Sequence, residues 1–520
     1  MAKLKRANTN LEDLVYPYEG TLDFDPVTIT ISPEYIEIQP VATAVSTPIS
    51  AVSTPVSAPR GASQWIRQSD VIAVRVDDKA YIPTQRLYCV DHGDDEDGDS
   101  TDMQFRAYDM TGLPSDYVEE VAVREIPEFL CSRPPAPAAA MNGHGGPPPK
   151  KAVMGRGREL YFVVSTHAGT QKAKRVFQSL VRPLLEDIGI DRYEVLETDG
   201  EESVARFTQN TILPRANQGV EQTVVLLSGD GGVVDLVNVL CKEGLKDGFV
   251  KPVVGLLPVG TANALAHSTR VAGDGTFGLR SLLGGVVKDL PTFRVKVSQG
   301  ARWVVDGGRG RKEVQGGEAF GAVVFSWGLH ASTVAMGDTA EYRRHGINRF
   351  NMAADELMHP NDGSEHHRYK GRVSLIKEGD KLETIERKEH SYVLASMVSN
   401  LDEHFCISPS SQPLDGQMQY VGIGAVSSAE VMRLLGKACQ GGLHVDEKSV
   451  TYEAIEGLWI GVDEEEGEWR QVCVDGQIVA LEKGGWAEAT RDHRPVAQMI
   501  VRKMVEKQLI FESVLPEDQE

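Results

Sequence analysis

The chain has 520 residues, and its 54 basic and 75 acidic side chains give a formal net charge of −21. A negative charge of this size repels nucleic acid, which excludes a nucleic-acid-binding protein and limits contact with an anionic membrane to local patches. No run of 18 apolar residues exists, the N-terminus lacks the apolar core of a signal peptide, and six scattered cysteines show no C-x-x-C spacing, so we expect a cytoplasmic protein that is at most peripherally attached to membranes.

The first quarter of the chain divides by composition. Residues 1–64 are rich in Pro, Ser, Thr and Ala and contain a tandem repeat over 44–57, which predicts a flexible leader. Short stretches of β-branched and aromatic residues between polar turns predict a small β-rich module over 65–132. Residues 133–156, rich in Pro, Gly and Ala, are typical of a disordered linker.

The next part of the chain repeats a strand, a glycine-containing loop and a helix. Three short apolar runs, at 159–164, 223–228 and 253–257, are each followed by such a loop and then by helical spacing. Apolar runs stopped by glycine are typical of buried parallel strands, whose carboxyl ends hold the ligand sites of open α/β sheets. Glycine in such a loop lets the backbone approach an anion at the helix N-terminus. The sequence therefore predicts a Rossmann-like nucleotide-binding α/β domain.

Two of these loops carry motifs. Residues 228–238 read Ser-Gly-Asp-Gly-x-x-x-Asp-x-x-Asn, and residues 258–266 read Pro-x-Gly-Thr-x-Asn-x-x-Ala. The pair resembles the catalytic domain shared by diacylglycerol, sphingosine and ceramide kinases. The chain departs from the family where Ser165-Thr166 replaces Asn-Pro and where Asp-Gly-Gln at 475–477 replaces Asp-Gly-Glu.

The resemblance implies an architecture like that of NAD kinase and diacylglycerol kinase. The ATP-binding α/β domain would span 157–290, and an antiparallel β-rich lipid-substrate domain would span 291–520. Numerous alternating strands after residue 290 agree with the second domain. Helical spacing over 496–511 predicts a C-terminal helix packed on the body.

The activity that the resemblance implies is ATP- and Mg²⁺-dependent phosphorylation of a lipid hydroxyl on diacylglycerol, ceramide or a sphingoid base. Asp230 would be the catalytic base, and Asp475 would support the metal ion. Glycine backbone, small polar side chains and fixed positive charges would hold the nucleotide. The residues implied in nucleotide binding are Gly169, Lys172, Thr198, Ser228, Gly229, Gly231, Gly260, Thr261, Asn263, Arg343, Arg349, Asp475 and Gly476.

Two other functions remain open on the same fold. The departures from the family motifs favour a catalytically weak or inactive scaffold that binds lipid or nucleotide, whereas a soluble substrate such as NAD would make the protein a small-molecule kinase. Asp230 argues against the scaffold, and the Trp327 to Phe350 stretch argues for a lipid substrate. The implied partners are the lipid and a transient membrane surface, without nucleic acid, and a homodimer is left open.

Sphingosine is not the lipid that the sequence favours. Sphingosine kinases carry early aspartates after Trp-Gly, and alignment on Tyr342-Arg343 places Val334 and Met336 at those positions. Asp338 is the acidic residue that remains nearby. Without those carboxylates a cationic amine loses a charge-assisted contact, so we expect a neutral lipid alcohol to be preferred.

Overall fold

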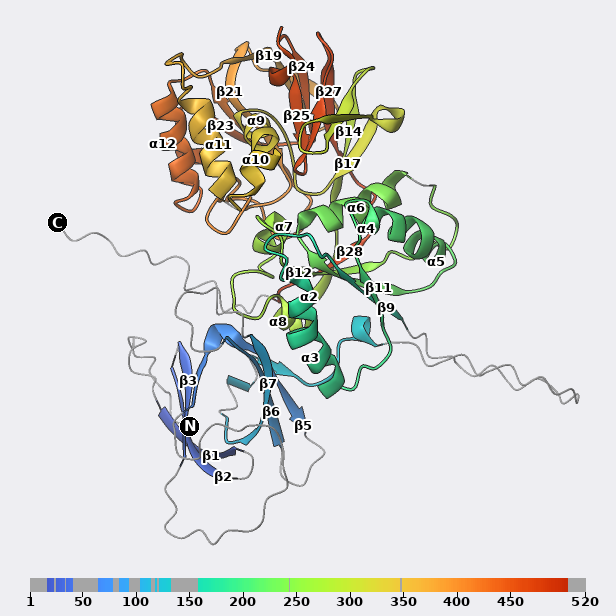
Figure 1. The fold of residues 1–520 in the computed structure, drawn as a ribbon, viewed down its shortest axis with the longest axis vertical. Helices are drawn as coiled ribbons and strands as arrows, with labels where there is room; N and C mark the ends of the chain where they lie inside the picture. Colours follow the sequence, from blue (N-terminus) through green and yellow to red (C-terminus); the bar gives the residue numbers. More distant parts are fainter. Residues whose placement is uncertain are drawn as a thin grey trace, which may run out of the picture.

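The computed structural model describes residues 16–22, 25–32, 34–40, 64–77, 84–92, 103–113, 117–118, 121–131, 158–242, 244–346 and 348–503. The repeat over 44–57, the linker over 133–156 and the predicted helical residues 504–511 lie outside the described residues. Three parts are stacked along the long axis, with the N-terminal strands at one end and the β-rich domain at the other (Figure 1).

The N-terminal part is a sheet whose described strands run in the order β4-β3-β2-β1-β7-β6-β5-β8. The prediction of a flexible leader was wrong for residues 16–22, 25–31 and 35–40, which form β1, β2 and β3. Val27 and Ile29 alternate with exposed or half-buried neighbours, and Ile36 and Ile38 do the same on the paired strand, so four side chains enter the core. The strands are β1 (Tyr16–Leu22), β2 (Asp25–Ile31), β3 (Tyr35–Pro40), β4 (Gln64–Arg67), β5 (Val71–Asp77), β6 (Thr84–Asp91), β7 (Gln104–Thr111) and β8 (Ala122–Val123).

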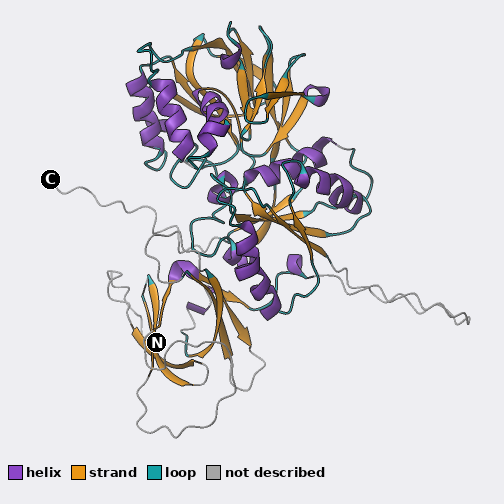
Figure 2. Ribbon diagram, viewed as in Figure 1, coloured by secondary structure: helices purple, strands orange, loops and turns teal. Residues whose placement is uncertain are grey.

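The middle part is the predicted α/β domain. Its sheet has the order β10-β9-β11-β12-β28-β13, and every described pair in it is parallel except β13 with β28. Helices cover both faces (Figure 2). Its elements are β9 (Glu159–Val164), α2 (Ala173–Val176), α3 (Arg182–Asp187), β10 (Glu194–Glu197), α4 (Ser203–Phe207), α5 (Leu213–Ala216), β11 (Gln222–Ser228), α6 (Asp230–Lys242), β12 (Val253–Pro258), α7 (Ala264–Ser268), α8 (Leu279–Gly284) and β13 (Val286–Asp289).

Strand order fixes where this sheet can bind a ligand. The chain passes from β9 to β10 on one side and then returns to place β11 on the other side of β9. The loops after β9 and β11 therefore diverge at a topological switch point, where open α/β sheets bind ligands.

The last part is the predicted antiparallel β-rich domain. Its hydrophobic core continues into that of the α/β domain across the face of β11 and α6. None of its described helices, nor those of the rest of the described chain, is long and apolar enough to cross a membrane. Its elements are β14 (Thr292–Val297), β15 (Arg302–Val305), β16 (Gly310–Glu313), β17 (Glu318–Gly321), β18 (Val324–Gly328), α9 (Leu329–Gly337), α10 (Ala340–Arg343), α11 (Asn348–Met358), β19 (Tyr369–Lys377), β20 (Lys381–Thr384), β21 (Glu389–Ser396), β22 (Met418–Gly424), α12 (Ser428–Ala438), β23 (Val450–Ile455), β24 (Gly457–Val462), β25 (Gln471–Val474), β26 (Gln477–Ala480) and β27 (Trp486–Asp492).

The chain then returns to the α/β domain as β28 (Gln498–Val501). The prediction of a helix that begins at residue 496 was wrong for this stretch. The backbone of this stretch pairs with β12 on one side and with β13 on the other, and the side chains of Met499 and Ile500 are buried. A short apolar run can form a strand where two strand edges are open to pair with it. The strand β28 therefore lies within the sheet of the α/β domain, between β12 and β13.

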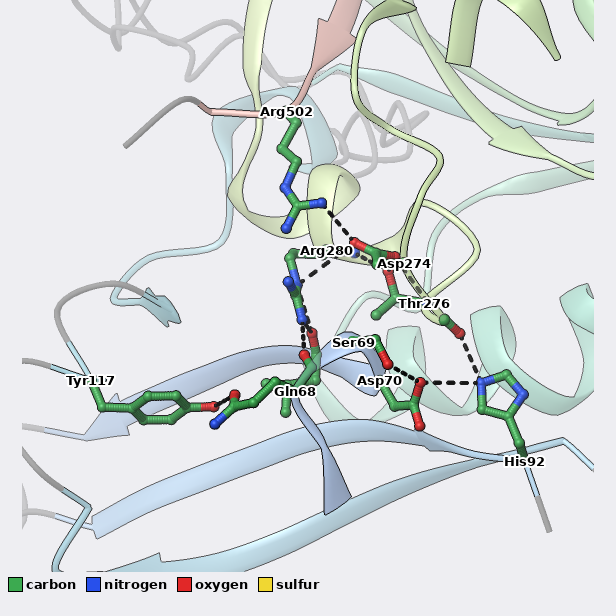
Figure 3. A network of polar contacts seen from close by, with 11 residues as sticks. Gln68, Ser69, Asp70, His92, Tyr117, Asp274, Thr276, Arg280 and Arg502 are labelled. Carbon is green, nitrogen blue, oxygen red and sulfur yellow. Dashed lines mark hydrogen bonds and ion pairs between the residues drawn. The ribbon is translucent and has the colours of Figure 1, made fainter. Parts of the chain in front are cut away.

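The N-terminal sheet is docked on the α/β domain by polar contacts (Figure 3). The Arg280 guanidinium donates to the carbonyl oxygens of Gln68, at 2.6 Å, and Val71, at 2.7 Å from Nε. Asp274, in the loop that precedes α8, accepts a hydrogen bond from Arg502 at 3.1 Å, which ties this loop to the end of β28. Beside these contacts one hydrophobic cluster is shared by both parts. The N-terminal sheet is therefore an integral part of the fold.

Replacing Met499 by Asp should destabilise the α/β domain by at least about 3 kcal/mol, because an unpaired carboxylate would be buried in its sheet. Thermal unfolding of the purified protein measures the loss. Val286→Asp is the matched control, since Val286 on the neighbouring β13 is 39% exposed, and it should cost under about 1 kcal/mol. Equal melting temperatures for the two variants would contradict the placement of β28.

Candidate active site

Three loops meet at the carboxyl ends of β9, β11 and β12, and glycine is what lets them meet. A Cβ on Gly260 would lie 2.4 Å from the Cα of Gly229, and a Cβ on Gly169 would lie 2.4 Å from the carbonyl oxygen of Val259. Gly169 also has a φ of +52°. These three glycines allow backbone to touch backbone. Close packing between the loops thus explains why glycine stands at these three positions.

Gly231 differs from the other three glycines. It lies in the first turn of α6, and apart from its chain neighbours and the backbone of its own helix no described atom comes within 4 Å of the position that its Cβ would occupy. A ligand that approached the backbone N–H groups of this helix start would use that open space.

Asp230 is the first residue of α6, and its side chain joins the second loop to the third. Its Oδ2 accepts a hydrogen bond from the backbone N–H of Ala264 at 2.7 Å, and its Oδ1 accepts from that of Leu265 at 2.9 Å. Burial raises the pKa of this carboxyl, and the two N–H groups partly offset that effect. Asp230 is therefore fixed in position and is a stronger base than an exposed aspartate.

The loop after β12 is closed by Asn263. This residue has a φ of +55°, its Oδ1 accepts from the N–H of Gly260 at 3.0 Å, and its Nδ2 donates to the Gly260 carbonyl at 3.1 Å. Asn263 thereby sets the start of α7 and the two N–H groups that hold Asp230. Thr261, within the closed turn, is half-buried.

Two of the predicted nucleotide-binding side chains face the protein interior. Thr198 is buried, and its hydroxyl accepts from the backbone N–H of Thr166 at 3.1 Å, which fixes the loop after β9. Ser228 is buried beneath Gly232 in the first turn of α6. Both residues support the loops from behind. Lys172 directly precedes α2 and is half-buried.

Asp475 comes to this place from the β-rich domain. It stands with Gly476 in the turn between β25 and β26, where their φ angles are +49° and +84°. Its carboxylate accepts from the backbone N–H groups of Ala322, Val323 and Val324 at 2.6, 3.0 and 2.7 Å. Burial raises its pKa to about 7, and the nearby charge of Asp230 adds to the rise. The carboxylates of Asp230 and Asp475, one from each domain, therefore lie near one another.

These two carboxylates bear on the implied metal ion. Mg²⁺ in proteins is commonly held by one or two carboxylates together with substrate phosphates and waters. In the described part of the chain, no three His, Cys, Asp or Glu side chains are grouped to hold a metal. A magnesium ion bound here would therefore have to take its remaining ligands from a nucleotide and from water.

The two predicted arginines lie on the short helices after α9, in different surroundings. Arg343 forms a two-bond ion pair with Asp338, at 3.0 and 2.9 Å, and lies 3.7 Å from Glu201 in the α/β domain. Arg349 lies over the ring of Phe350, its buried Nε has no partner among the described residues, and burial lowers its pKa. Of the two, Arg349 has the unmet hydrogen-bonding capacity that an anionic oxygen would satisfy.

Asn238 has a role that the sequence motif did not reveal. Its Nδ2 donates to the carbonyl of Phe320 at 2.8 Å, and its Oδ1 accepts from the Phe320 N–H at 3.1 Å, so α6 is clamped to β17 of the other domain. The residues that follow Phe320 supply the N–H groups that hold Asp475. One helix therefore carries Asp230 and also sets the position of Asp475. The first motif contains this residue as its final Asn, but the motif does not indicate the contact with β17.

Comparison with known proteins defines the class. Residues 159–295 match the diacylglycerol kinase catalytic domain family. A sphingosine kinase 1 of Caenorhabditis elegans is 34% identical over 114 residues, which cover 22% of this chain and 23% of that protein. A sphingosine kinase 2 of Arabidopsis thaliana is 28% identical over 115 residues, with 22% and 23% covered.

A solved diacylglycerol kinase structure from Bacillus anthracis is similar with a TM-score of 0.44 and 15% identity, and the match covers 66% of this chain and 97% of that one. The chain spans less than a quarter of the length of the curated relatives that it matches. Residues 159–295, which form most of the α/β domain, thus match the diacylglycerol kinase catalytic domain family, and a stretch of the chain is similar to sphingosine kinases.

Two glycine substitutions separate loop packing from ligand binding. Gly260→Ala should lower stability by ~1–3 kcal/mol, because its Cβ would push against Gly229.

Gly231→Val should leave the melting temperature within a few degrees of the parent yet weaken ATP binding on the order of tenfold or more, by filling the space beside the helix start. Nucleotide titration calorimetry measures the affinity. Parental ATP affinity in Gly231→Val would show that no phosphate approaches this turn.

Proposed function

We propose that the protein transfers the γ-phosphoryl group of ATP to a hydroxyl group of a lipid. The observation that carries the proposal is the fixed carboxylate of Asp230, which lies at the meeting of the three loops and near Asp475 of the β-rich domain. A lipid substrate also implies transient contact of the protein with a membrane surface.

Asp230 would accept the proton of the lipid hydroxyl, or orient that hydroxyl, during transfer. Its raised pKa suits this work, because a base is most effective when its pKa lies near the working pH. The hydrogen bonds from Ala264 and Leu265 keep the carboxylate from turning away. Positioning of this kind supplies much of the rate in phosphoryl transfer, where little covalent work falls to the protein.

Positive charge for the phosphates would come from two arginines of the β-rich domain. Arg349 would bind phosphate oxygens through its free Nε, and Arg343 would do so on leaving Asp338. Asp475 would hold Mg²⁺ together with the nucleotide. When bound, ATP supplies the phosphoryl group and Mg²⁺ screens the phosphate charges. The residues of this chain would then bind the nucleotide, orient the lipid hydroxyl and accept its proton.

Asp230→Asn should lower kcat by ~100- to 10,000-fold, because the amide cannot take a proton. The amide also places an N–H group against a backbone N–H at the start of α7, so we expect a loss of about 1 kcal/mol in stability as well. Radiolabelled-ATP assays over a panel of lipids measure the rate. Asp235→Asn, a like change in a buried carboxyl five residues along α6, is the control and should lower kcat less than about tenfold. Parental activity in purified Asp230→Asn would remove the role assigned to this residue.

The β-rich domain favours a neutral lipid over a sphingoid base. Helix α9, which directly follows Trp327-Gly328, carries no carboxylate over Leu329–Gly337. Asp338, the next acid, already forms the two-bond ion pair with Arg343. A cationic amine placed here would have to compete with that guanidinium for its counter-charge.

Sphingosine should therefore be a poorer substrate than a neutral lipid alcohol by one to two orders of magnitude, which corresponds to the loss of a charge-assisted contact of ~1.5–3 kcal/mol. Competition between sphingosine and diacylglycerol in mixed micelles measures the preference. A clear preference for sphingosine that Asp338→Asn abolishes would reverse this assignment.

A further inference from the structure

A turn of the N-terminal sheet holds the loop that follows helix α7. This turn is the short helix η2 (Gln68–Asp70), and residues 269–278 form the loop, which we call the α7–α8 loop. The backbone N–H of Gly275 donates to the carbonyl of Ser69 at 3.1 Å, and the carbonyl oxygen of Gly275 lies 3.0 Å from Nε2 of His92, just after β6. The N-terminal sheet thus holds both polar groups of Gly275 (Figure 3).

Gly275 leaves no room between the α7–α8 loop and the N-terminal sheet. A Cβ on Gly275 would overlap Oδ1 of Asp70 and would lie 3.0 Å from Nε2 of His92. The backbone of Gly275 does not adopt the left-handed conformation that favours glycine. Contact with the sheet, and not the conformation of the chain, therefore explains why glycine stands here.

The other end of the α7–α8 loop is bonded to α7 itself. The backbone N–H groups of Val271 and Ala272 both donate to the carbonyl of Ala266, at 2.8 and 3.0 Å. Ala266 directly follows Leu265, whose N–H group is one of the two that hold the carboxylate of Asp230. The residue to which the loop is bonded is therefore next to a hydrogen-bond donor of the candidate base.

Between its two ends the α7–α8 loop has little slack. Oδ1 of Asp274 accepts from the N–H and the hydroxyl of Thr276, at 3.0 and 2.6 Å, which closes a tight turn around Gly275. At the end of the loop, a Cβ on Gly278 would lie 3.1 Å from the carbonyl oxygen of Leu256 on β12. The loop is thus bonded within itself and packed on the strand that precedes α7, so a displacement at Gly275 would be passed on to α7.

Helix α7 is too short to fix its own position. It has five residues, and isolated helices shorter than about 12 residues are marginal in water. The hydroxyl of Ser268, its last residue, exchanges two hydrogen bonds with the backbone of Asn400 in the β-rich domain, at 3.2 and 3.0 Å. The α7–α8 loop supplies the corresponding hold from the side of the N-terminal sheet.

We propose that the N-terminal sheet, through its hold on Gly275, positions the start of α7 and thereby keeps the carboxylate of Asp230 in place for phosphoryl transfer. The inference rests on the proposed lipid kinase activity, which assigns that role to Asp230. Gly275 and His92 are positioning residues, because they act through α7. A misplacement of about 1 Å caused far from the reacting atoms can lower a rate about a hundredfold.

Gly275→Ala tests the proposal in the full-length protein. The added methyl group would push the loop away from Asp70. We expect amide hydrogen exchange at Ala264 and Leu265 to become about tenfold faster relative to the amides of β11, and kcat in the lipid assay to fall roughly ten- to a hundredfold. The amides of β11, in the middle of the sheet, report global unfolding, so the ratio separates a local change from a loss of overall stability.

His92→Ala is a second test variant. It removes one of the two contacts to Gly275 without adding atoms to the interface, so it should change exchange and kcat in the same direction by a smaller factor.

Arg86→Gln is the matched control. Arg86 joins β6 to Asp187 at the end of α3 by two hydrogen bonds, at 3.0 and 2.5 Å, so its loss weakens the docking of the same sheet at α3 instead of at the α7–α8 loop. It should leave kcat and the exchange of Ala264 and Leu265, relative to β11, at the parental values.

The outcomes separate the two proposals. Faster exchange at α7 and a lower kcat in Gly275→Ala and His92→Ala, with neither change in Arg86→Gln, support the positioning role of the N-terminal sheet. Parental exchange or parental kcat in both test variants, or equal changes in Arg86→Gln, overturn the inference while the kinase function stands. A parent protein that phosphorylates no lipid of the panel overturns the proposed function, whereas the exchange rates still decide whether the sheet positions α7.

Discussion

The contact on which the candidate site depends is the one between the loops after β11 and β12. Gly229 and Gly260 approach so closely that a single methyl group would not fit between them. This approach brings the start of α7 within reach of Asp230, whose carboxylate then accepts two of the backbone N–H groups that an isolated helix start leaves unpaired. The same two bonds that satisfy α7 therefore hold the proposed base in place.

Helix α6 transmits this arrangement to the second domain. Asp230 begins the helix, and Asn238, eight residues later, clamps Phe320 with two hydrogen bonds. The chain after Phe320 then offers three N–H groups to Asp475. A shift of the β-rich domain relative to α6 would therefore have to break the two hydrogen bonds of Asn238. The shared hydrophobic core resists the same shift.

The two ends of the described chain both stabilise the α/β domain. The strand β28 fills the place between β12 and β13, and Arg502 just beyond it binds Asp274 in the loop that also receives the N-terminal sheet. Arg280 holds the backbone of that sheet from the other side. Contacts between residues so far apart in sequence make the middle domain dependent on both of its neighbours (Figure 3).

The sequence alone determined the α/β domain, its three loops and the β-rich domain, because local patterns encode them. Apolar runs that stop at glycine specify buried strands and close backbone turns without reference to the rest of the chain. Tertiary structure alone decided that the strands β1 to β3 pair into a sheet, that residues 498–501 are a strand and that Arg343 binds Asp338. A short apolar stretch fits a helix or a strand equally well until an open edge pairs with it, and a charged side chain has no partner until the fold brings one near.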